Sequence, residues 1–278
     1  MLYGRTDELN KLNDYYNGVG NSFIMLYGRS NIGKTALLRE FIKDKKAFYY
    51  NAALASEKEQ AELLAMHMNR AGLITDYEMQ GLMELSDDVS IIYTHLFKST
   101  ARLEGDTKVV IIEEFQNIVK NSDAFMPVID ELVKGSLYGE KVVMIVTSSS
   151  VSWIENSMVS AIGRYALSIS TFIKLKELSF VDIVRMFPKH SVLDAMAIYA
   201  VTGGVPGYLA QFSAGKSLKD NIVQNVLNNG RMLRTAGVII LRKNSGRLRF
   251  IIRFCTALHR ERINLMSFMY IQDSDVIK

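Results

Sequence analysis

The chain has 278 residues, of which 49% are hydrophobic, and its formal net charge is +4. This length accommodates one large domain or one domain with a smaller companion, and the apolar content suffices for a buried core. No apolar run is long enough to cross a membrane, and the beginning of the chain is polar and charged. We therefore expect no membrane span or membrane partner, no signal peptide and a cytoplasmic location. The single cysteine, Cys255, excludes an intramolecular disulfide and a cysteine-based metal site.

The first part of the chain predicts a helix, a strand and a second helix. Thr6 is a candidate helix cap, and the leucines that follow it recur at helical spacing. The apolar run 23–27 predicts a strand, and residues 36–42 predict the next helix. Further along, residues 47–52 predict a short strand, and residues 56–72 predict a helix capped at Ser56.

Residues 28–35 join the strand 23–27 to the helix that follows and read Gly-Arg-Ser-Asn-Ile-Gly-Lys-Thr. This is the G-x-x-x-x-G-K-[ST] pattern, in which backbone N–H groups and the helix N-terminus cradle phosphates. Lys34 is expected to reach the β- and γ-phosphates, and Thr35 to ligate Mg²⁺. The alternative is an ordinary strand-to-helix turn. ATP or ADP with Mg²⁺ is the predicted ligand, with contacts from Gly28, Arg29, Ser30, Asn31, Ile32, Gly33, Lys34, Thr35 and Ala36.

The middle of the chain alternates strands with helices. A helix over 87–102 precedes a strand that starts at residue 108, whose four consecutive β-branched residues 109–112 predict burial on both faces. A helix over 125–137 and a buried strand over 141–150 follow, and 169–175 predicts the last strand. This alternation predicts an α/β fold with a parallel sheet flanked by helices, and ligands at the carboxyl ends of its strands.

Two carboxylates, Glu113 and Glu114, come directly after the run 109–112. In P-loop ATPases a second strand ends in a carboxylate that holds Mg²⁺, often followed by a glutamate that orients the attacking water. We accordingly assign Glu113 to the metal and Glu114 to catalysis. The alternative is that both carboxylates only make the end of the strand soluble.

Three further candidate residues follow the carboxylates in the sequence. Ser148 and Ser149 lie near the end of the strand 141–150, where they could sense the γ-phosphate or help to place the water, and strand-end capping is the alternative. Arg164 is a candidate arginine finger that acts across a subunit or domain contact, and an ordinary surface arginine is the alternative.

Six blocks of sequence, taken together, resemble the archaeal ATPase family, AAA-like P-loop ATPases of the STAND class. The resemblance covers roughly residues 1–212, and its blocks are L-Y-G-R-x-D-E-L at 2–9, the P-loop region 26–38, V-V-I-I-E-E-F-Q-N-I-V at 109–119, I-V-T-S-S-S-V-S-W-I-E-N-S-M at 145–158, I-G-R at 162–164 and T-G-G-V-P-G-Y-L at 202–209. It implies that Gly4 and Arg5 approach the adenine side of the nucleotide. It also implies that Pro206 touches the nucleotide from a helical lid, although 203–206 also fits an ordinary interhelical turn.

The chain departs from the family pattern at two places. Glu113 stands where the family usually has Asp, and its extra methylene is expected to affect hydrolysis more than binding. Family members continue beyond the lid into a winged helix, of which 248–268 would supply only the first helices. The predicted organisation is thus a P-loop ATPase core over 1–176, a small helical lid over 177–229 and a basic helical tail, an incomplete winged helix, over 230–278.

The tail is strongly basic, because residues 230–262 contain nine arginines and lysines against Glu261 alone. Such asymmetry favours contact with DNA, and a solvated basic face is the alternative. Three functional hypotheses remain open: a slow Mg²⁺-dependent ATPase, a nucleotide-dependent switch with negligible turnover that a protein partner or a second copy senses, and either of these with DNA bound to the tail.

Overall fold

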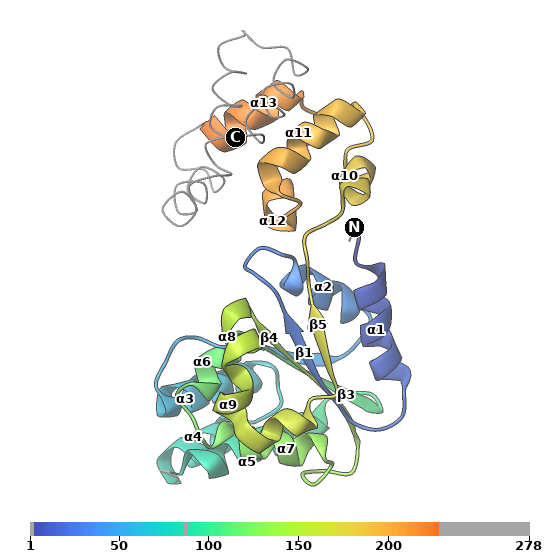
Figure 1. Ribbon diagram of the computed structural model, residues 1–278. Helices are drawn as coiled ribbons and strands as arrows, with labels where there is room; N and C mark the ends of the chain where they lie inside the picture. The colour runs from blue at the N-terminus through green and yellow to red at the C-terminus, as the bar shows by residue number, and fades with distance from the viewer. Residues whose placement is uncertain (1–2, 86–87, 228–278) are drawn as a thin grey trace. The chain divides into compact units, whose positions relative to one another are not determined.

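The computed structural model describes residues 3–85 and 88–227 (Figure 1). The expectations for Cys255, for the basic segment 230–262 and for a partial winged helix over 248–268 lie outside the described residues. The chain divides into two compact units between Lys176 and Glu177. We call residues 4–176 the sheet unit and residues 177–227 the helical unit. Within the described ranges, no helix is both long enough and apolar enough to span a bilayer.

The sheet unit contains five parallel strands, which confirms the predicted α/β fold. Their order across the sheet is β2-β3-β4-β1-β5. The strand that leads into the P-loop, β1, is therefore separated from the carboxylate strand β3 by the hydroxyl-bearing strand β4 (Figure 1). The strands are β1 (Ser22–Tyr27), β2 (Ala47–Asn51), β3 (Thr107–Glu113), β4 (Lys141–Ser148) and β5 (Thr171–Lys174).

The register of the sheet brings the ends of β1, β3 and β4 to one edge. Tyr27 pairs with Ser148, and Ile112 pairs with Val146, so that the next residue along β3, Glu113, is level with Thr147. Two backbone bonds extend this alignment past the strands, because the Phe115 N–H donates to the Thr147 carbonyl at 3.0 Å and the Gly28 N–H donates to the Ser148 carbonyl at 3.2 Å. Residues that lie far apart in the sequence consequently meet where the strands end.

Helices cover both faces of the sheet (Figure 1). Residues 109–112 of β3 are fully buried, as the run of β-branched residues predicts, because alternate side chains enter the cores on opposite faces. One core includes Leu12 and Phe41, from the helices α1 (Thr6–Asn17) and α2 (Lys34–Phe41). The other face is covered by α3 (Glu57–Arg70), α4 (Asp76–Leu85), α5 (Val89–Ser99), α6 (Gln116–Val119), α7 (Phe125–Val133), α8 (Val151–Asn156) and α9 (Met158–Ile162).

Several local expectations differ from the structure. The prediction that Thr6 caps the first helix is wrong, because Thr6 is itself the first helical residue and Arg5 occupies the cap position without a side-chain bond. Ser56 occupies the cap position of α3, but its side chain makes no capping bond. The helix predicted over 87–102 is shorter: the Asp88 side chain caps α5, and the 3₁₀ turn η1 (Thr100–Arg102) follows it. The sequence interpretation also missed α4, α8, α9 and the 3₁₀ segment η2 (Gly163–Ser168).

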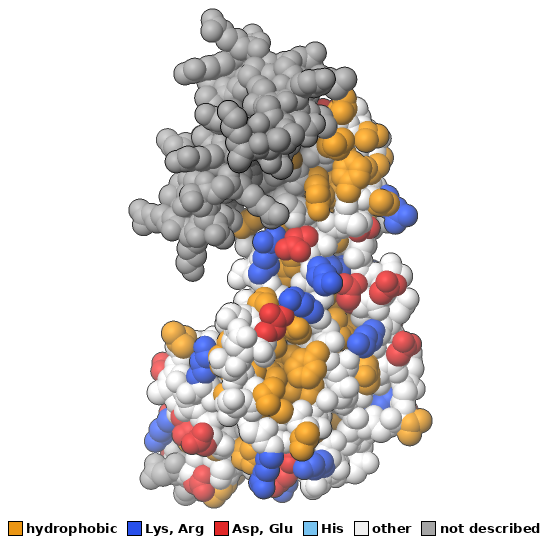
Figure 2. Space-filling model, viewed as in Figure 1, with side chains coloured by type: hydrophobic (Ala, Val, Ile, Leu, Met, Phe, Trp, Pro, Cys, Tyr) orange, Lys and Arg blue, Asp and Glu red, His pale blue; other side chains and the backbone are white. Residues whose placement is uncertain are grey.

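The helical unit consists of short helices around a small apolar core: α10 (Phe180–Met186), α11 (Val192–Thr202), α12 (Pro206–Leu209), α13 (Leu218–Ile222) and the π-helical turn η3 (Val223–Leu227). Ser179 and Ser191 begin α10 and α11 with reciprocal capping boxes, which fix where these helices start. Hydrophobic side chains also lie on the surface of the helical unit (Figure 2). Val192 of α11 is 60% exposed.

Candidate functional site

The loop 28–33 leaves β1, and α2 begins at Lys34, so the strand, loop and helix that the motif requires are present. Two glycines are needed for this path. A Cβ on Gly28 would lie 2.7 Å from the backbone oxygen of Leu175, where the chain leaving β5 passes the loop. Gly33, at the cap position of α2, has a φ of 98°, which favours glycine. The loop can therefore wrap tightly ahead of the helix N-terminus, as phosphate binding requires.

The Lys34 ammonium group lies inside this loop. It donates to the Gly28 carbonyl at 2.8 Å, to the Arg29 carbonyl at 3.4 Å and to the Ser149 hydroxyl at 2.7 Å. Burial lowers the pKa of Lys34, and the nearby carboxylates of Glu114 and Glu113 oppose that shift. The loop thus holds the lysine where a nucleotide's phosphates would be cradled, bonded to neutral acceptors that phosphate oxygens can replace.

Thr35 and Glu113 form a direct pair at the start of α2. The Thr35 hydroxyl lies 2.8 Å from one carboxylate oxygen of Glu113 and 3.1 Å from the other. A hydroxyl and a carboxylate supply the hard oxygen ligands that Mg²⁺ prefers. The buried Tyr49 hydroxyl makes no hydrogen bond to the described residues, although Glu113 and Thr35 both influence its pKa. This group of oxygens fits a hydrated Mg²⁺ ion, with Thr35 and Glu113 as the residues that would hold it.

Glu114 has an unusual backbone and a fully engaged carboxylate. Its φ of 52° lies in the left-handed region, where a non-glycine residue is strained. The carboxylate accepts bonds from the Ser149 N–H at 3.1 Å, from the Ser149 hydroxyl and from the Gln116 amide at 2.6 Å. Burial alone would raise the pKa of Glu114, but these hydrogen bonds and the charge of Lys34 outweigh it and lower the pKa. Glu114 is therefore an ionised group held by several donors.

Of the two candidate serines, the structure brings Ser149 to the P-loop. Its hydroxyl accepts from Lys34 and donates to Glu114, so it links the loop on β1 to the carboxylate after β3. Ser148 is fully buried, and its hydroxyl accepts from the Ser150 N–H at 3.0 Å, which is strand-end capping. The described contacts of Ser148 are thus those of the structural alternative.

Arg5 contacts the P-loop from its outer side. Its guanidinium group is buried and donates to the Ile32 carbonyl at 3.0 Å and to the Lys176 carbonyl at 2.5 Å, and it pairs with Glu8 at 3.1 Å. Arg5 therefore joins the N-terminus, the loop and the chain after β5. The preceding Gly4 has a φ of 61°. Contact of Gly4 and Arg5 with adenine stays a prediction.

Arg164 and Pro206 are not joined to the P-loop by any described hydrogen bond or ion pair. Arg164 is exposed in η2, where it bonds the Tyr165 hydroxyl at 3.3 Å and lies over the Tyr165 ring. Pro206 is the first residue of α12 in the helical unit. The turn before it is tightly built, because a Cβ on Gly204 would lie 2.5 Å from the Leu178 carbonyl oxygen. The roles predicted for Arg164 and Pro206 stay predictions.

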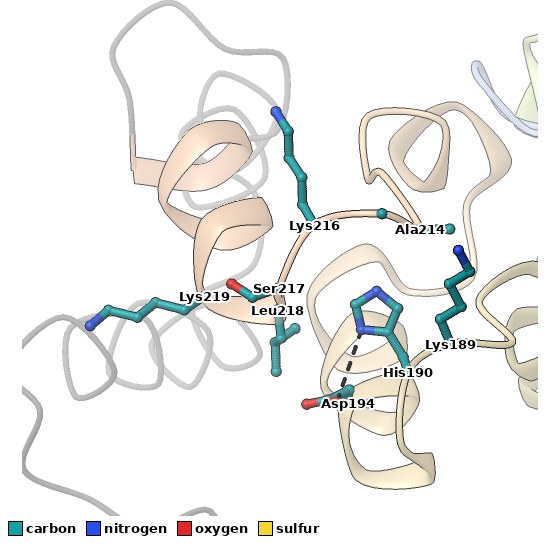
Figure 3. Close-up of a pocket in the computed structure, with 9 residues that line it drawn as sticks. Lys189, His190, Asp194, Ala214, Lys216, Ser217, Leu218 and Lys219 are labelled. Carbon is teal, nitrogen blue, oxygen red and sulfur yellow. Dashed lines mark ion pairs between the residues drawn. The ribbon is translucent and has the colours of Figure 1, made fainter.

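A separate depression of about 590 Å³ lies in the helical unit. Lys189, His190, Lys216 and Lys219 are among the residues that line it, and none of its lining residues comes from the P-loop. The long side chains of Lys216 and Lys219 point away from each other, and a contact of 4.0 Å joins His190 to Asp194 (Figure 3). The lysines do not converge on one point, so we assign no ligand to this depression.

The sequence interpretation missed three residues near the carboxylates. Gln116 bonds Glu114, and its position two residues after that glutamate was visible in the sequence. The Thr147 hydroxyl lies 3.4 Å from the Glu114 nitrogen, which required the register of β3 and β4. Tyr49 lies near Glu113 because of the β2–β3 pairing, for which the sequence carries no local signal.

Three features together define a P-loop NTPase fold. They are the parallel sheet, the glycine-containing loop between β1 and α2, and the carboxylates at the end of β3, which β4 separates from β1. A family model described as an ATPase domain found predominantly in Archaea matches residues 2–212, and the chain belongs to this family.

The chain is also similar to individual known proteins. An uncharacterized protein of Methanocaldococcus jannaschii is 25% identical over 209 residues, which are 75% of this chain and 43% of the relative. The chain thus spans less than half the length of this relative. The Walker-type ATPase of Pyrococcus abyssi has a TM-score of 0.57 at 15% identity, covering 87% of this chain and 74% of that chain. The Aeropyrum pernix ORC1 protein, solved in complex with DNA, has a TM-score of 0.55 at 16% identity, covering 87% and 66%. At these identities the solved structures show the fold alone.

Proposed function

We propose that this ATPase-family chain binds ATP or ADP with Mg²⁺ at the loop 28–35 and hydrolyses ATP slowly. The observation that carries the proposal is the continuous contact from Lys34 through Ser149 to Glu114. It joins the residue expected at the γ-phosphate to the residue expected at the attacking water. The Thr35–Glu113 pair supports a cation beside them.

The contacts of each residue suggest its part in the reaction. A bound Mg²⁺ would supply positive charge to the β- and γ-phosphate oxygens. Lys34 would exchange its two carbonyl contacts for phosphate oxygens, and the backbone N–H groups of the loop would orient the phosphates. Glu114 would orient the attacking water and accept its proton, since its carboxylate is ionised.

The same contacts support slow turnover. To accept a bond from water, Glu114 must give up one of its present donors, and the Gln116 amide is the one that takes no part in the link to Lys34. A hydrogen bond to a charged group is worth roughly 1.5–3 kcal/mol, so this exchange would slow the reaction by about tenfold or more. The longer side chain of Glu113, where Asp is usual, is a second reason to expect a low rate.

Phosphate release tests the proposal. We expect the purified chain to release phosphate from ATP only with Mg²⁺, and expect no release from the Lys34→Ala variant. Glu114→Gln should keep nucleotide binding, because the amide retains the shape of the side chain, and should lose hydrolysis. Hydrolysis by Glu114→Gln at the rate of the parent would refute the catalytic role of Glu114. Nucleotide binding by Lys34→Ala with the affinity of the parent would refute the site.

The second candidate is a nucleotide-dependent switch with negligible turnover, for which the bonded state of Glu114 also argues. A tight nucleotide complex without measurable phosphate release over hours distinguishes this function from slow hydrolysis. The switch proposal includes STAND-class behaviour and a protein partner that senses the bound nucleotide. It also includes self-association, in which the exposed Arg164 would act on a neighbouring copy. Light scattering tests self-association, because it measures whether nucleotide changes the mass of the parent and of Arg164→Ala.

DNA binding by the segment 230–262 is proposed from the charge of the sequence and from the fold shared with a DNA-bound protein of Aeropyrum pernix. Binding through phosphates predicts an affinity that falls steeply with salt. We expect the triple variant Arg247→Ala, Arg249→Ala, Arg253→Ala to bind DNA more weakly and with a shallower salt dependence. An affinity that neither salt nor this variant changes would contradict the proposal.

A further inference from the structure

Tyr49 lies on the same face of the sheet as Glu113. It pairs with Ile111 across the β2–β3 boundary, and Glu113 is two residues further along β3, so both side chains point to one face. The strand spacing and a two-residue rise together place their Cα atoms about 8 Å apart, within reach of two long side chains. The core on this face contains residues of α2, whose first turn carries Thr35. Tyr49 is therefore directed toward the proposed cation site.

The Tyr49 hydroxyl is buried and makes no hydrogen bond of ordinary geometry to the described residues, although the Glu113 carboxylate and the Thr35 hydroxyl lie near it. A buried hydroxyl that makes no hydrogen bond destabilises the protein, so its retention at such a position calls for an explanation. The phenol carries its proton near neutral pH, because the ordinary pKa of tyrosine is about 10, and it can donate that proton in a hydrogen bond.

We propose that Tyr49 is a positioning residue for the cation site, whose hydroxyl donates to the Glu113 carboxylate when Mg²⁺-nucleotide is bound. The inference rests on the proposed binding of Mg²⁺-nucleotide at the loop 28–35. The donor to Glu113 in the present structure is the Thr35 hydroxyl, and Thr35 is also the residue expected to ligate the cation. A second donor would hold the carboxylate in place when Thr35 turns to the metal. Such outer partners orient metal-binding carboxylates, and their loss typically weakens metal affinity by about 10–100-fold.

The length of Glu113 explains why this chain would need the second donor. Glutamate has one more rotatable bond than aspartate, so its carboxylate samples more positions and loses more freedom when it is fixed. A donor from a second element, Tyr49 of β2, would restrict the carboxylate to one position once Thr35 turns to the cation.

The full chain carrying Tyr49→Phe tests the inference by a binding measurement that does not depend on turnover. ADP affinity is measured by calorimetry at a series of Mg²⁺ concentrations and in EDTA. We expect the Mg²⁺ concentration for half-maximal effect to rise about tenfold, and affinity in EDTA to stay within about twofold of the parent. The melting temperature should be equal or higher, because the change removes an unpartnered hydroxyl.

Tyr50→Phe is the matched control. Tyr50 is the next residue on β2, its side chain is buried, and its hydroxyl bonds Gln60 within the core on the opposite face of the sheet. We expect this variant to leave the Mg²⁺ dependence unchanged. Tyr49→Phe should also add nothing to Glu113→Gln, since Tyr49 acts through that carboxylate.

Two results would overturn the role of Tyr49 alone: a Mg²⁺ dependence that Tyr49→Phe leaves unchanged, or a loss of ADP affinity that is equal with Mg²⁺ and with EDTA. The second result would identify Tyr49 as support for the packing of the loop. A parent chain that binds no ADP would overturn the proposed function, and this inference with it.

Discussion

Ser149 contacts Glu114 through two groups at once, its backbone N–H at 3.1 Å and its hydroxyl, while the same hydroxyl accepts a bond from Lys34 at 2.7 Å. One side chain thus joins Lys34, the lysine proposed to bind phosphate, to Glu114, the carboxylate proposed to orient water. Because β4 lies between β1 and β3, the residue that follows it is placed between the loop and the carboxylate. The order of the strands, rather than any local motif, gives Ser149 this position.

Ser149→Ala should lower phosphate release at least tenfold and change ADP affinity little. The variant disconnects Lys34 from Glu114, whereas the backbone N–H groups of the loop remain to bind the nucleotide. Single-turnover phosphate release and calorimetric ADP binding measure the two effects separately. A variant as fast as the parent would show that the contact in the structure plays no part in hydrolysis.

Gln116→Leu is the companion variant, because Gln116 bonds Glu114 but has no described contact with Lys34. Loss of this one donor should free Glu114 to accept water, so we expect phosphate release to increase several-fold at unchanged ADP affinity. The substitution also removes the buried Gln116 amide oxygen, which has no partner among the described residues. A decrease in rate would instead assign Gln116 to placing Glu114 in its productive position.

Glu113→Asp should have opposite effects on stability and on rate. Aspartate is shorter by a methylene and would lose the contact with the Thr35 hydroxyl, at a cost of about 1 kcal/mol to the nucleotide-free protein. It would also restore the residue usual in the resembled family, so we expect faster hydrolysis. Thermal melting without nucleotide measures the stability, and phosphate release with Mg²⁺ measures the rate of hydrolysis. A slower variant would show that the surrounding oxygens are adapted to glutamate.

The parallel sheet, and a candidate site at the carboxyl ends of its strands, could be predicted from the sequence because both depend on local patterns in the chain. The run 109–112 and the loop 28–35 each carry their own signal. Short helices such as α8 and α9 were missed, since a few turns do not establish a helical period. The predicted Thr6 cap was wrong because the cap is the last non-helical residue before a helix. The buried contacts of Arg5 make Arg5 that residue, one position earlier than predicted.

The partners within the candidate site required the three-dimensional structure. Lys34 and Ser149 are 115 residues apart, and Thr35 and Glu113 are 78 apart. Their meeting depends on strand order and register, which the sequence alone left open. The strained φ of Glu114 has the same origin, because the chain must turn sharply after β3 while its N–H and carboxylate both face the end of β4.

Glu114 should make stability depend on pH in an identifiable range. Its pKa is lowered in the folded protein, so its contribution is fully present above the unfolded-state pKa of about 4.3 and is lost as pH falls through the folded value. We expect the melting temperature of Glu114→Gln to lie below that of the parent near neutral pH, and the gap to narrow as pH falls below about 4. A gap that stays constant down to acidic pH would contradict the lowered pKa.

Arg5→Ala should destabilise the sheet unit and weaken nucleotide binding through the loop. The variant leaves the carbonyls of Ile32 and Lys176 without their donor and breaks the pair with Glu8, so we expect a loss of about 3 kcal/mol in the free energy of unfolding.

Comparison of ATP with inorganic triphosphate as ligands of Arg5→Ala separates this role from the adenine contact implied by the family resemblance. If Arg5 acts by holding the loop, both ligands lose affinity by the same factor, because both use only the loop for their phosphates. If Arg5 contacts adenine, ATP alone loses affinity and triphosphate binding is unchanged. We expect the equal loss, because the described hydrogen bonds of the guanidinium go to the loop, to the chain after β5 and to Glu8.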